Sequence, residues 1–290
     1  MKFKIKDPLV LSLIILTVCL ITFLSVKVLP QTTKQKDQKL FTNPIDQIRK
    51  IEISSQNQIS QLEKTDQGWI VVSEQNLPAD QDKIDRLLEA VSKVEKTDLV
   101  SQNATDNQDK YGLDPKTVIR IKINYQNGSQ SELLVGNSGP DYQKDYILIP
   151  NQSEIYLSNL GLRAVLVQPR WKNLTVTSVY SDQIKKMTVN QKAIDDLESD
   201  QTKQLIGQVI NLTAEQTQPT QPGQDLGFDQ SKLQISIQTE DQTINLTFGN
   251  SNQQGQQYLQ TDQPEVVYLI SSEKFKQISQ AVDQLLSENI

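Results

Sequence analysis

Two parts of this chain carry the same short motifs in the same order, and this repetition constrains the fold more than any other sequence feature. Matching positions lie 136 residues apart at the first pair of motifs and 112 apart at the last pair. Repetition of this kind indicates a supersecondary unit copied in tandem. The paired motifs are 46–51 with 182–187, 111–114 with 226–229, 136–138 with 249–251, 146–148 with 258–260 and 155–157 with 267–269.

The sequence therefore predicts a first unit at 45–168, a connector at 169–177 and a second unit at 178–288. The first unit is longer because it carries extra residues at 58–78, which contain a Gly-Trp strand paired with the strand before it. We expect the second unit to keep at most a remnant of this hairpin, at 193–197.

Each unit contains a segment in which apolar and polar residues alternate on both sides of a turn. In the first unit Ile119, Ile121 and Ile123 alternate with polar residues before a turn at Asn127 and Gly128. The second unit repeats the pattern with three apolar residues on each side of its turn. Clean period-two alternation is typical of antiparallel sheets with one covered face.

Helices are expected to cover that face in both units. Apolar residues at helical spacing predict one helix after Asp80, a second near 205–212 and a third near 275–286. The fold class is therefore α+β, with two tandem copies of an antiparallel-sheet-plus-helix unit behind one N-terminal transmembrane helix. The Gln/Thr/Pro-rich segment 213–224 is expected to be a loop.

The N-terminal apolar run at 9–28 predicts a single membrane anchor, because about 20 apolar residues span the hydrocarbon core of a bilayer. Three lysines precede the run, which favours a cytoplasmic tail at 1–8 and an extracytoplasmic C-terminal region after a tether at 29–44. The alternatives are a cleaved signal peptide and a lipoprotein acylated at Cys19. The run is long for a signal peptide, and Val18 before the cysteine is not small.

Composition excludes several kinds of chemistry. The chain has no histidine and one cysteine, so histidine-based acid/base catalysis and Cys/His zinc sites are excluded. A net charge of −6 with scattered basic residues argues against nucleic acid as a partner. We assign no catalytic, cofactor-binding or metal-binding residue from the sequence.

The motifs of the first unit resemble family 4340 of the bacterial domains of unknown function. They are the Gly-Trp-Ile strand at 68–70, Tyr-Gly-Leu-Asp-Pro at 111–115, Gly136, Tyr146 and Ile-Tyr-Leu at 155–157. The resemblance extends to the second unit with two departures, since leucine and glutamine replace the tyrosine and proline of the second motif. It implies a membrane-anchored bacterial protein, similar in some members to accessory partners of gliding-type ABC export systems.

Three motifs that suggest chemistry have simpler interpretations. Ser271 and Lys274 form a Ser-x-x-Lys pair, which we interpret as a helix cap beside an exposed lysine. The acidic run Asp195, Asp196, Glu198 and Asp200 fits no calcium loop and is expected to be a solvated face. The repeated Gly-Asn-Ser is expected to be a structural turn rather than a phosphate-binding loop.

Aromatic residues are the other candidates for a binding surface. Trp69, Tyr111 and Tyr156 lie in predicted strands or beside them, where aromatic rings usually pack in the core. Trp171 lies in the connector, where it would either anchor one unit on the other or be exposed to solvent.

The sequence favours an extracytoplasmic accessory or scaffold module, tethered to the cell membrane and binding protein partners in a membrane complex. One alternative is a glycan- or peptide-binding module that uses a groove between the two units. A second alternative is a hydrolase that uses carboxylates only.

Overall fold

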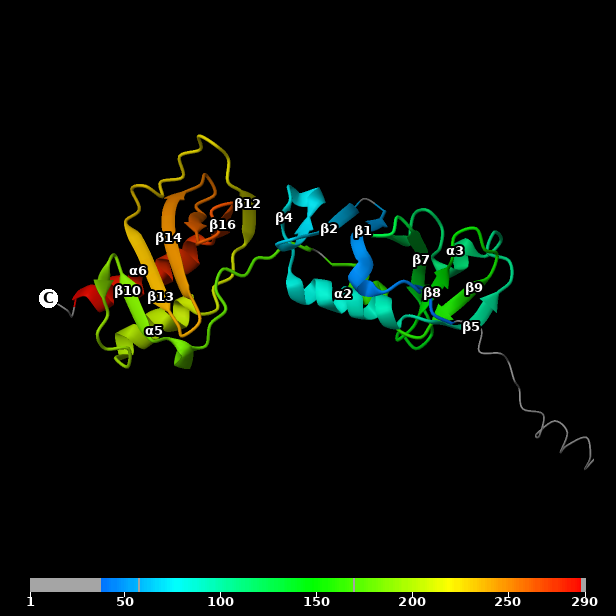
Figure 1. Ribbon diagram of the computed structural model, residues 1–290, viewed down its shortest axis with the longest axis horizontal. Helices are drawn as coiled ribbons and strands as arrows, with labels where there is room; N and C mark the ends of the chain where they lie inside the picture. The colour runs from blue at the N-terminus through cyan, green and yellow to red at the C-terminus, as the bar shows by residue number, and fades with distance from the viewer. Residues whose placement is uncertain (1–37, 57, 169, 288–290) are drawn as a thin grey trace, which may run out of the picture. The chain divides into compact units, whose positions relative to one another are not determined.

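The computed structural model describes residues 38–56, 58–168 and 170–287, and its two antiparallel sheets are shown in Figure 1. Together with the helices packed on them, these sheets confirm the α+β class. The predicted anchor at 9–28 lies outside the described residues. No helix within the described part of the chain is both long and apolar enough to cross a membrane.

The first sheet has nine strands in the order β4-β3-β2-β1-β6-β7-β8-β9-β5. Its strands are β1 (Ile48–Ser55), β2 (Gln58–Thr65), β3 (Gly68–Val71), β4 (Leu77–Pro78), β5 (Lys96–Ser101), β6 (Ile119–Tyr125), β7 (Gln130–Ser138), β8 (Asp145–Leu148) and β9 (Ile155–Ser158). The accompanying helices are η1 (Ile45–Gln47), η2 (Val72–Glu74), α2 (Gln81–Lys93), α3 (Gln108–Tyr111) and α4 (Arg163–Leu166).

The second sheet has seven strands in the order β11-β10-β13-β14-β15-β16-β12. Its strands are β10 (Lys186–Val189), β11 (Lys192–Ala193), β12 (Gln216–Pro219), β13 (Leu233–Gln238), β14 (Thr243–Ser251), β15 (Gln257–Gln260) and β16 (Val266–Ile270). Its helices are η3 (Ser181–Gln183), α5 (Asp200–Val209) and α6 (Ser272–Ser287).

The two sheets share one strand order once β3 and β4 are set aside. Read from β2 to β5, each strand of the first sheet has a counterpart at the same place in the second. The extra strands fall in the segment 58–78, where the first copy is longer in sequence. The hairpin that remains in the second sheet is short, because β11 has two residues.

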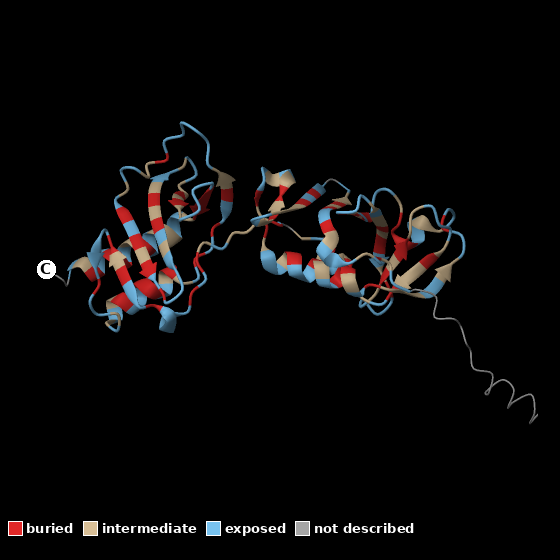
Figure 2. Cartoon of the chain, viewed as in Figure 1, coloured by how far each residue is buried: buried red, intermediate tan, exposed pale blue. Residues whose placement is uncertain are grey.

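The predicted alternation places the core on one face of each sheet, and Figure 2 shows the buried positions as bands along the strands. On β6 the isoleucines at 119, 121 and 123 are buried, and helix α2 packs against them through Ile84 and Leu87. Asp80 caps α2 as predicted, since its carboxylate accepts a hydrogen bond from the Lys83 N–H at 3.2 Å.

Helices α5 and α6 cover the inner face of the second sheet. Both contribute buried residues to a core shared with the strands, among them Leu205 and Val209 from α5 and Ile278 and Val282 from α6. A helix pair over an antiparallel sheet leaves the other face of the sheet to be covered by loops or to face solvent.

Three sequence predictions are corrected by the structure. The segment 213–224 is not wholly a loop, because it contains the edge strand β12, which pairs with β16. The sequence did not predict this strand because its residues are polar and it ends in Pro219, although both features are compatible with a sheet edge. The repeated Gly-Asn-Ser is not a turn, because it lies within β7 and β14. Trp171 is not exposed to solvent, because it is buried in the core of the first sheet.

The last residues of the expected tether also belong to the folded region. Phe41 is buried in the first core, and the Leu40 N–H donates to the Val94 carbonyl at 3.3 Å. An isolated bridge between Lys39 and Glu95 precedes these contacts. The chain therefore enters the fold at Lys39, beside the start of β5.

Candidate functional site

A glycine in the left-handed conformation packs against an asparagine at the same place in both sheets. Gly112 has φ +66° and Gly227 has φ +80°. A Cβ atom on Gly112 would lie 2.4 Å from Cγ of Asn137, and a Cβ atom on Gly227 would lie 2.4 Å from Cγ of Asn250. These contacts leave no room for a side chain unless the asparagine moves, and they hold the loop before β6 against β7 and the loop before β13 against β14.

The asparagine lies in a bulge that also requires a glycine. The pairing register shifts between Val135 and Ser138 in β7, and the equivalent shift occurs in β14. A Cβ atom on Gly136 would lie 2.2 Å from the Tyr111 carbonyl oxygen. The repeated Gly-Asn-Ser is therefore a structural bulge that the preceding loop packs against.

The serine of the bulge fixes the first residue of the next strand. Ser138 Oγ donates to Asp145 Oδ1 at 2.9 Å in the first sheet, and Ser251 Oγ donates to Gln257 Oε1 at 2.8 Å in the second. Asp145 and Gln257 are both buried. One acidic and one neutral residue thus fill the same structural position, which does not require a charge.

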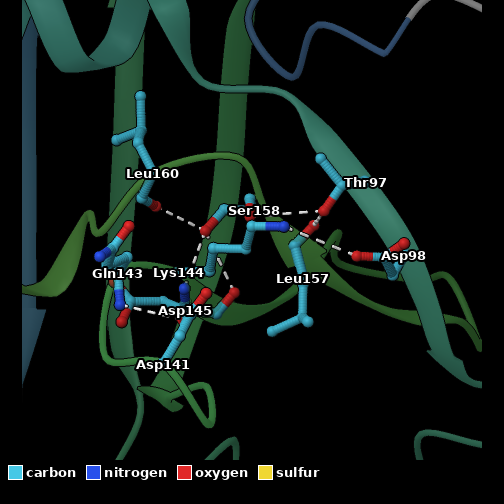
Figure 3. Close-up of polar contacts among 9 residues, drawn as sticks. All are labelled: Thr97, Asp98, Asp141, Gln143, Lys144, Asp145, Leu157, Ser158 and Leu160. Atoms are coloured by element: carbon cyan, nitrogen blue, oxygen red, sulfur yellow. Dashed lines mark hydrogen bonds and ion pairs between the residues drawn. The ribbon is translucent and has the colours of Figure 1, made fainter.

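Asp145, the first residue of β8, is hydrogen-bonded to Ser158, the last residue of β9 (Figure 3). Its N–H donates to Ser158 Oγ at 2.9 Å, and Ser158 Oγ donates to the Leu160 carbonyl at 2.6 Å. Its second carboxylate oxygen accepts the Arg163 N–H at 2.6 Å, at the start of α4. Hydrogen bonds engage both carboxylate oxygens, so this buried acid has a structural role.

The segment between β5 and β6 covers the outer face of the first sheet over β8 and β9. The Tyr111 ring, at the end of α3, lies 4.6 Å from the Tyr146 ring on β8, measured between centroids. Around them a small separate core forms, with Leu113, Leu148 and Ile155 buried. The segment between β5 and β6 therefore acts as a lid on this face.

The same face of the second sheet is open. Residues 220–232, which replace the lid segment, form no helix and leave a groove of about 850 Å³ over β14, β15 and β16. Leu226 stands where the first sheet has Tyr111, and Tyr258, the counterpart of Tyr146, is half-buried in the groove. This volume lies in the range that small-molecule sites occupy.

Amide side chains dominate the lining of the groove. Eight of its fourteen lining residues are asparagine or glutamine, including Gln216 and Gln218 on β12 and Asn250 on β14. Its charged residues in the described structure are Glu215 and Asp225, and no cation lines it. The site is therefore rich in hydrogen-bonding groups and carries negative charge.

One rim of the groove is held by an internal network. Asn252 Oδ1 accepts the N–H groups of Gln254 and Gln256 at 3.0 and 2.9 Å. The Gln256 amide donates to Glu215 Oε2 at 2.5 Å, which ties the loop 252–256 to the start of β12. The side chains of Gln216 and Gln218 have no hydrogen-bond partner among the described residues, so these amides remain available to a ligand.

The motifs singled out in the sequence lie away from this groove. Ser271 caps α6 as predicted, with Oγ accepting the Lys274 N–H at 3.2 Å. Lys274 is half-buried rather than exposed, because its ammonium donates to Gln208 Oε1 at 3.0 Å. Asp195, Asp196, Glu198 and Asp200 are exposed as expected, and no group of three His, Cys, Asp or Glu in the described structure could hold a metal ion.

The candidate aromatic residues are mostly structural. Trp69 and Tyr111 are buried, and Tyr156 is half-buried with the Lys96 ammonium 4.9 Å from its ring centroid. Sequence reasoning missed Tyr258 and the groove amides. Their one sequence signal is the abundance of glutamine around 216–224 and 252–260, which does not by itself indicate a shared surface.

Comparison with known proteins identifies one family. Residues 69–204 match the family described as a domain of unknown function, DUF4340. The chain is similar to this family over that segment. The DUF4340 match runs from β3 to α5 and so includes residues of both sheets. No curated protein and no solved structure matches the chain.

Proposed function

We propose that this protein is a membrane-tethered, extracytoplasmic accessory module that binds through the outer groove of its second unit and performs no catalysis. One observation carries the proposal. The same sheet face is closed by Tyr111 and α3 in the first unit and open over Tyr258 in the second. Two copies of one framework thus differ at one equivalent place, which is covered over Tyr146 and open over Tyr258.

The contacts beneath the two outer faces support a binding role for the second unit. The Gly112–Asn137 and Gly227–Asn250 contacts are the same in both units, so the sheet beneath each outer face is built alike. The structural acid Asp145 becomes the neutral Gln257 beside the groove. The groove side of the second unit thus shares these supporting contacts with the first unit, and amide side chains dominate its lining.

The membrane part of the proposal rests on the apolar run at 9–28 and the three lysines before it. Family resemblance favours a place beside an ABC-type export system in a bacterial cell membrane. Protease added to spheroplasts is expected to digest the region after residue 40. Full protection of that region would contradict the extracytoplasmic placement.

Site-specific photocrosslinking tests the binding face. A photoreactive amino acid at Gln216, inside the groove, is compared with one at Gln280, an exposed glutamine of α6 outside it. In native membranes we expect a discrete adduct, either protein or glycan, from position 216 and none from position 280. Equal adducts at both positions, or none at either, would overturn the proposal that the groove is the binding face.

A further inference from the structure

The lining of the groove indicates the chemistry of its ligand. Each amide side chain offers two donors and an acceptor with two lone pairs, so a surface of amides matches a ligand that both donates and accepts at many points. Hydroxyl groups do both. Gln216 and Gln218 on β12 and Asn250 on β14 present such amide groups to the groove.

The negative charge of the groove favours neutral over anionic ligands. Glu215 and Asp225 line it, and no lysine or arginine does so among the described residues. An anionic polymer would lie against two carboxylates in a lining that contains no lysine or arginine. The groove therefore favours a ligand without phosphate, sulfate or carboxylate groups.

The backbone around the groove disfavours an extended peptide. Strands β14, β15 and β16 are paired on both sides, so their main-chain groups are already hydrogen-bonded. At the edge strand β12, Arg170 donates to the Glu215 carbonyl at 2.7 Å and Lys172 to the Thr217 carbonyl at 3.4 Å. Pro219 has no N–H, so little of this edge can pair with an added strand.

An apolar strip on the floor completes the site. Tyr258 pairs with Leu269 across β15 and β16, and both line the groove. The face of a tyrosine ring is electron-rich and apolar, so it packs well against the C–H groups on one face of a sugar ring. Amides above such a floor would bind the hydroxyl groups at the edge of the same ring.

We infer that the groove over β14, β15 and β16 binds a neutral oligosaccharide, with Tyr258 packing against a sugar ring and Gln218 hydrogen-bonding its hydroxyls. This inference rests on the proposed function and names its ligand class. The rim residues Asn252 and Gln256 hold the loop in place before the ligand arrives, which reduces the entropy lost on binding.

Calorimetric titration of the full chain in nanodiscs tests the inference. The probes are neutral hexasaccharides of glucose, mannose and N-acetylglucosamine, with an oligogalacturonate and a neutral hexapeptide as competing classes. We expect at least one neutral hexasaccharide to bind. Tyr258→Ala and Gln218→Ala should each weaken it about tenfold, while Tyr258→Phe retains most of the affinity.

Matched controls remove the same groups outside the groove. Tyr180→Ala and Gln280→Ala should leave the affinity unchanged, since both residues are exposed elsewhere. Unchanged thermal unfolding of each variant would show that any loss of binding is local.

The inference is overturned if no neutral hexasaccharide binds at millimolar concentration, if the groove variants bind as well as the controls, or if the peptide or the acidic sugar binds in its place. A protein adduct from position 216 without sugar binding would overturn this inference and leave the proposed function standing.

Discussion

A Cβ atom added to Gly227 would lie 2.4 Å from Cγ of Asn250, and the backbone N–H of Asn250 donates to the Leu226 carbonyl at 2.6 Å. The loop before β13 and the bulge of β14 therefore approach so closely that a side chain at position 227 would have to displace the Asn250 side chain. The same relationship joins Gly112 to Asn137 in the first sheet. It is the most specific feature that the two sheets share.

Gly227→Ala should destabilise the fold by about 2–4 kcal/mol, because it adds a steric conflict to an unfavourable φ. Gly223→Ala is the matched control. Gly223 has nearly the same φ, +79°, but nothing lies within 4 Å of its added Cβ, so about 1 kcal/mol is expected. Chemical unfolding of the full chain in detergent measures both. Equal losses would show that the asparagine contact adds nothing.

Trp171→Ala should destabilise the first sheet by about 3–5 kcal/mol, because its side chain is buried in that core. A backbone hydrogen bond holds Trp171 in place, since its carbonyl accepts the Asp80 N–H at 2.7 Å. Tyr180→Ala, at a side chain 75% exposed, should change stability by no more than about 0.5 kcal/mol. A similar small effect at position 171 would contradict its place in the core.

Ser158→Ala should cost about 1–3 kcal/mol, because it leaves the buried N–H of Asp145 without its acceptor. Ser92→Ala serves as the control, since Ser92 Oγ donates to the Glu89 carbonyl on the exposed side of α2 and no buried group depends on it. Hydrogen exchange at the Asp145 amide should rise in the first variant and not in the second. Unchanged exchange at that amide would refute the role given to Ser158.

The carboxyl group of Asp114 should titrate below the usual range of aspartate. Hydrogen bonds from the Thr117 hydroxyl and the Lys116 N–H lower the pKa of Asp114. Because this pKa is lower in the folded than in the unfolded chain, its stabilising effect is present above the unfolded pKa and is lost as the pH falls through the folded pKa. Thr117→Val should raise the pKa of Asp114 toward its ordinary value, as measured by NMR titration. A pKa that does not move would exclude the threonine as the main cause.

The sequence predicted the framework because the framework follows from local rules. Alternating isoleucines at 119, 121 and 123 specify a strand with one buried face, and the paired motifs 136–138 and 249–251 lie in the counterpart strands β7 and β14. β12 was missed because an edge strand needs little apolar surface, and its buried residue is Thr217 rather than an apolar residue.

The groove was not predictable in the same way. Gln218, Asn250 and Tyr258 are far apart in sequence and meet only when β12, β14 and β15 are assembled in one sheet. Its openness also depends on what the lid segment lacks, since residues 220–232 form no equivalent of α3.

Occupancy of the second unit's groove in the membrane is the central claim. Cysteine labelling tests this in a Cys19→Ser background. Gln254→Cys places a thiol on the groove rim, and Gln280→Cys places one on α6 as the reference. The rate of reaction with a maleimide is measured for each thiol, first in native membranes and then in purified protein. The account predicts that position 254 reacts at least about tenfold more slowly in membranes than when purified, while position 280 reacts equally in both. Equal rates at position 254 in the two preparations would contradict it.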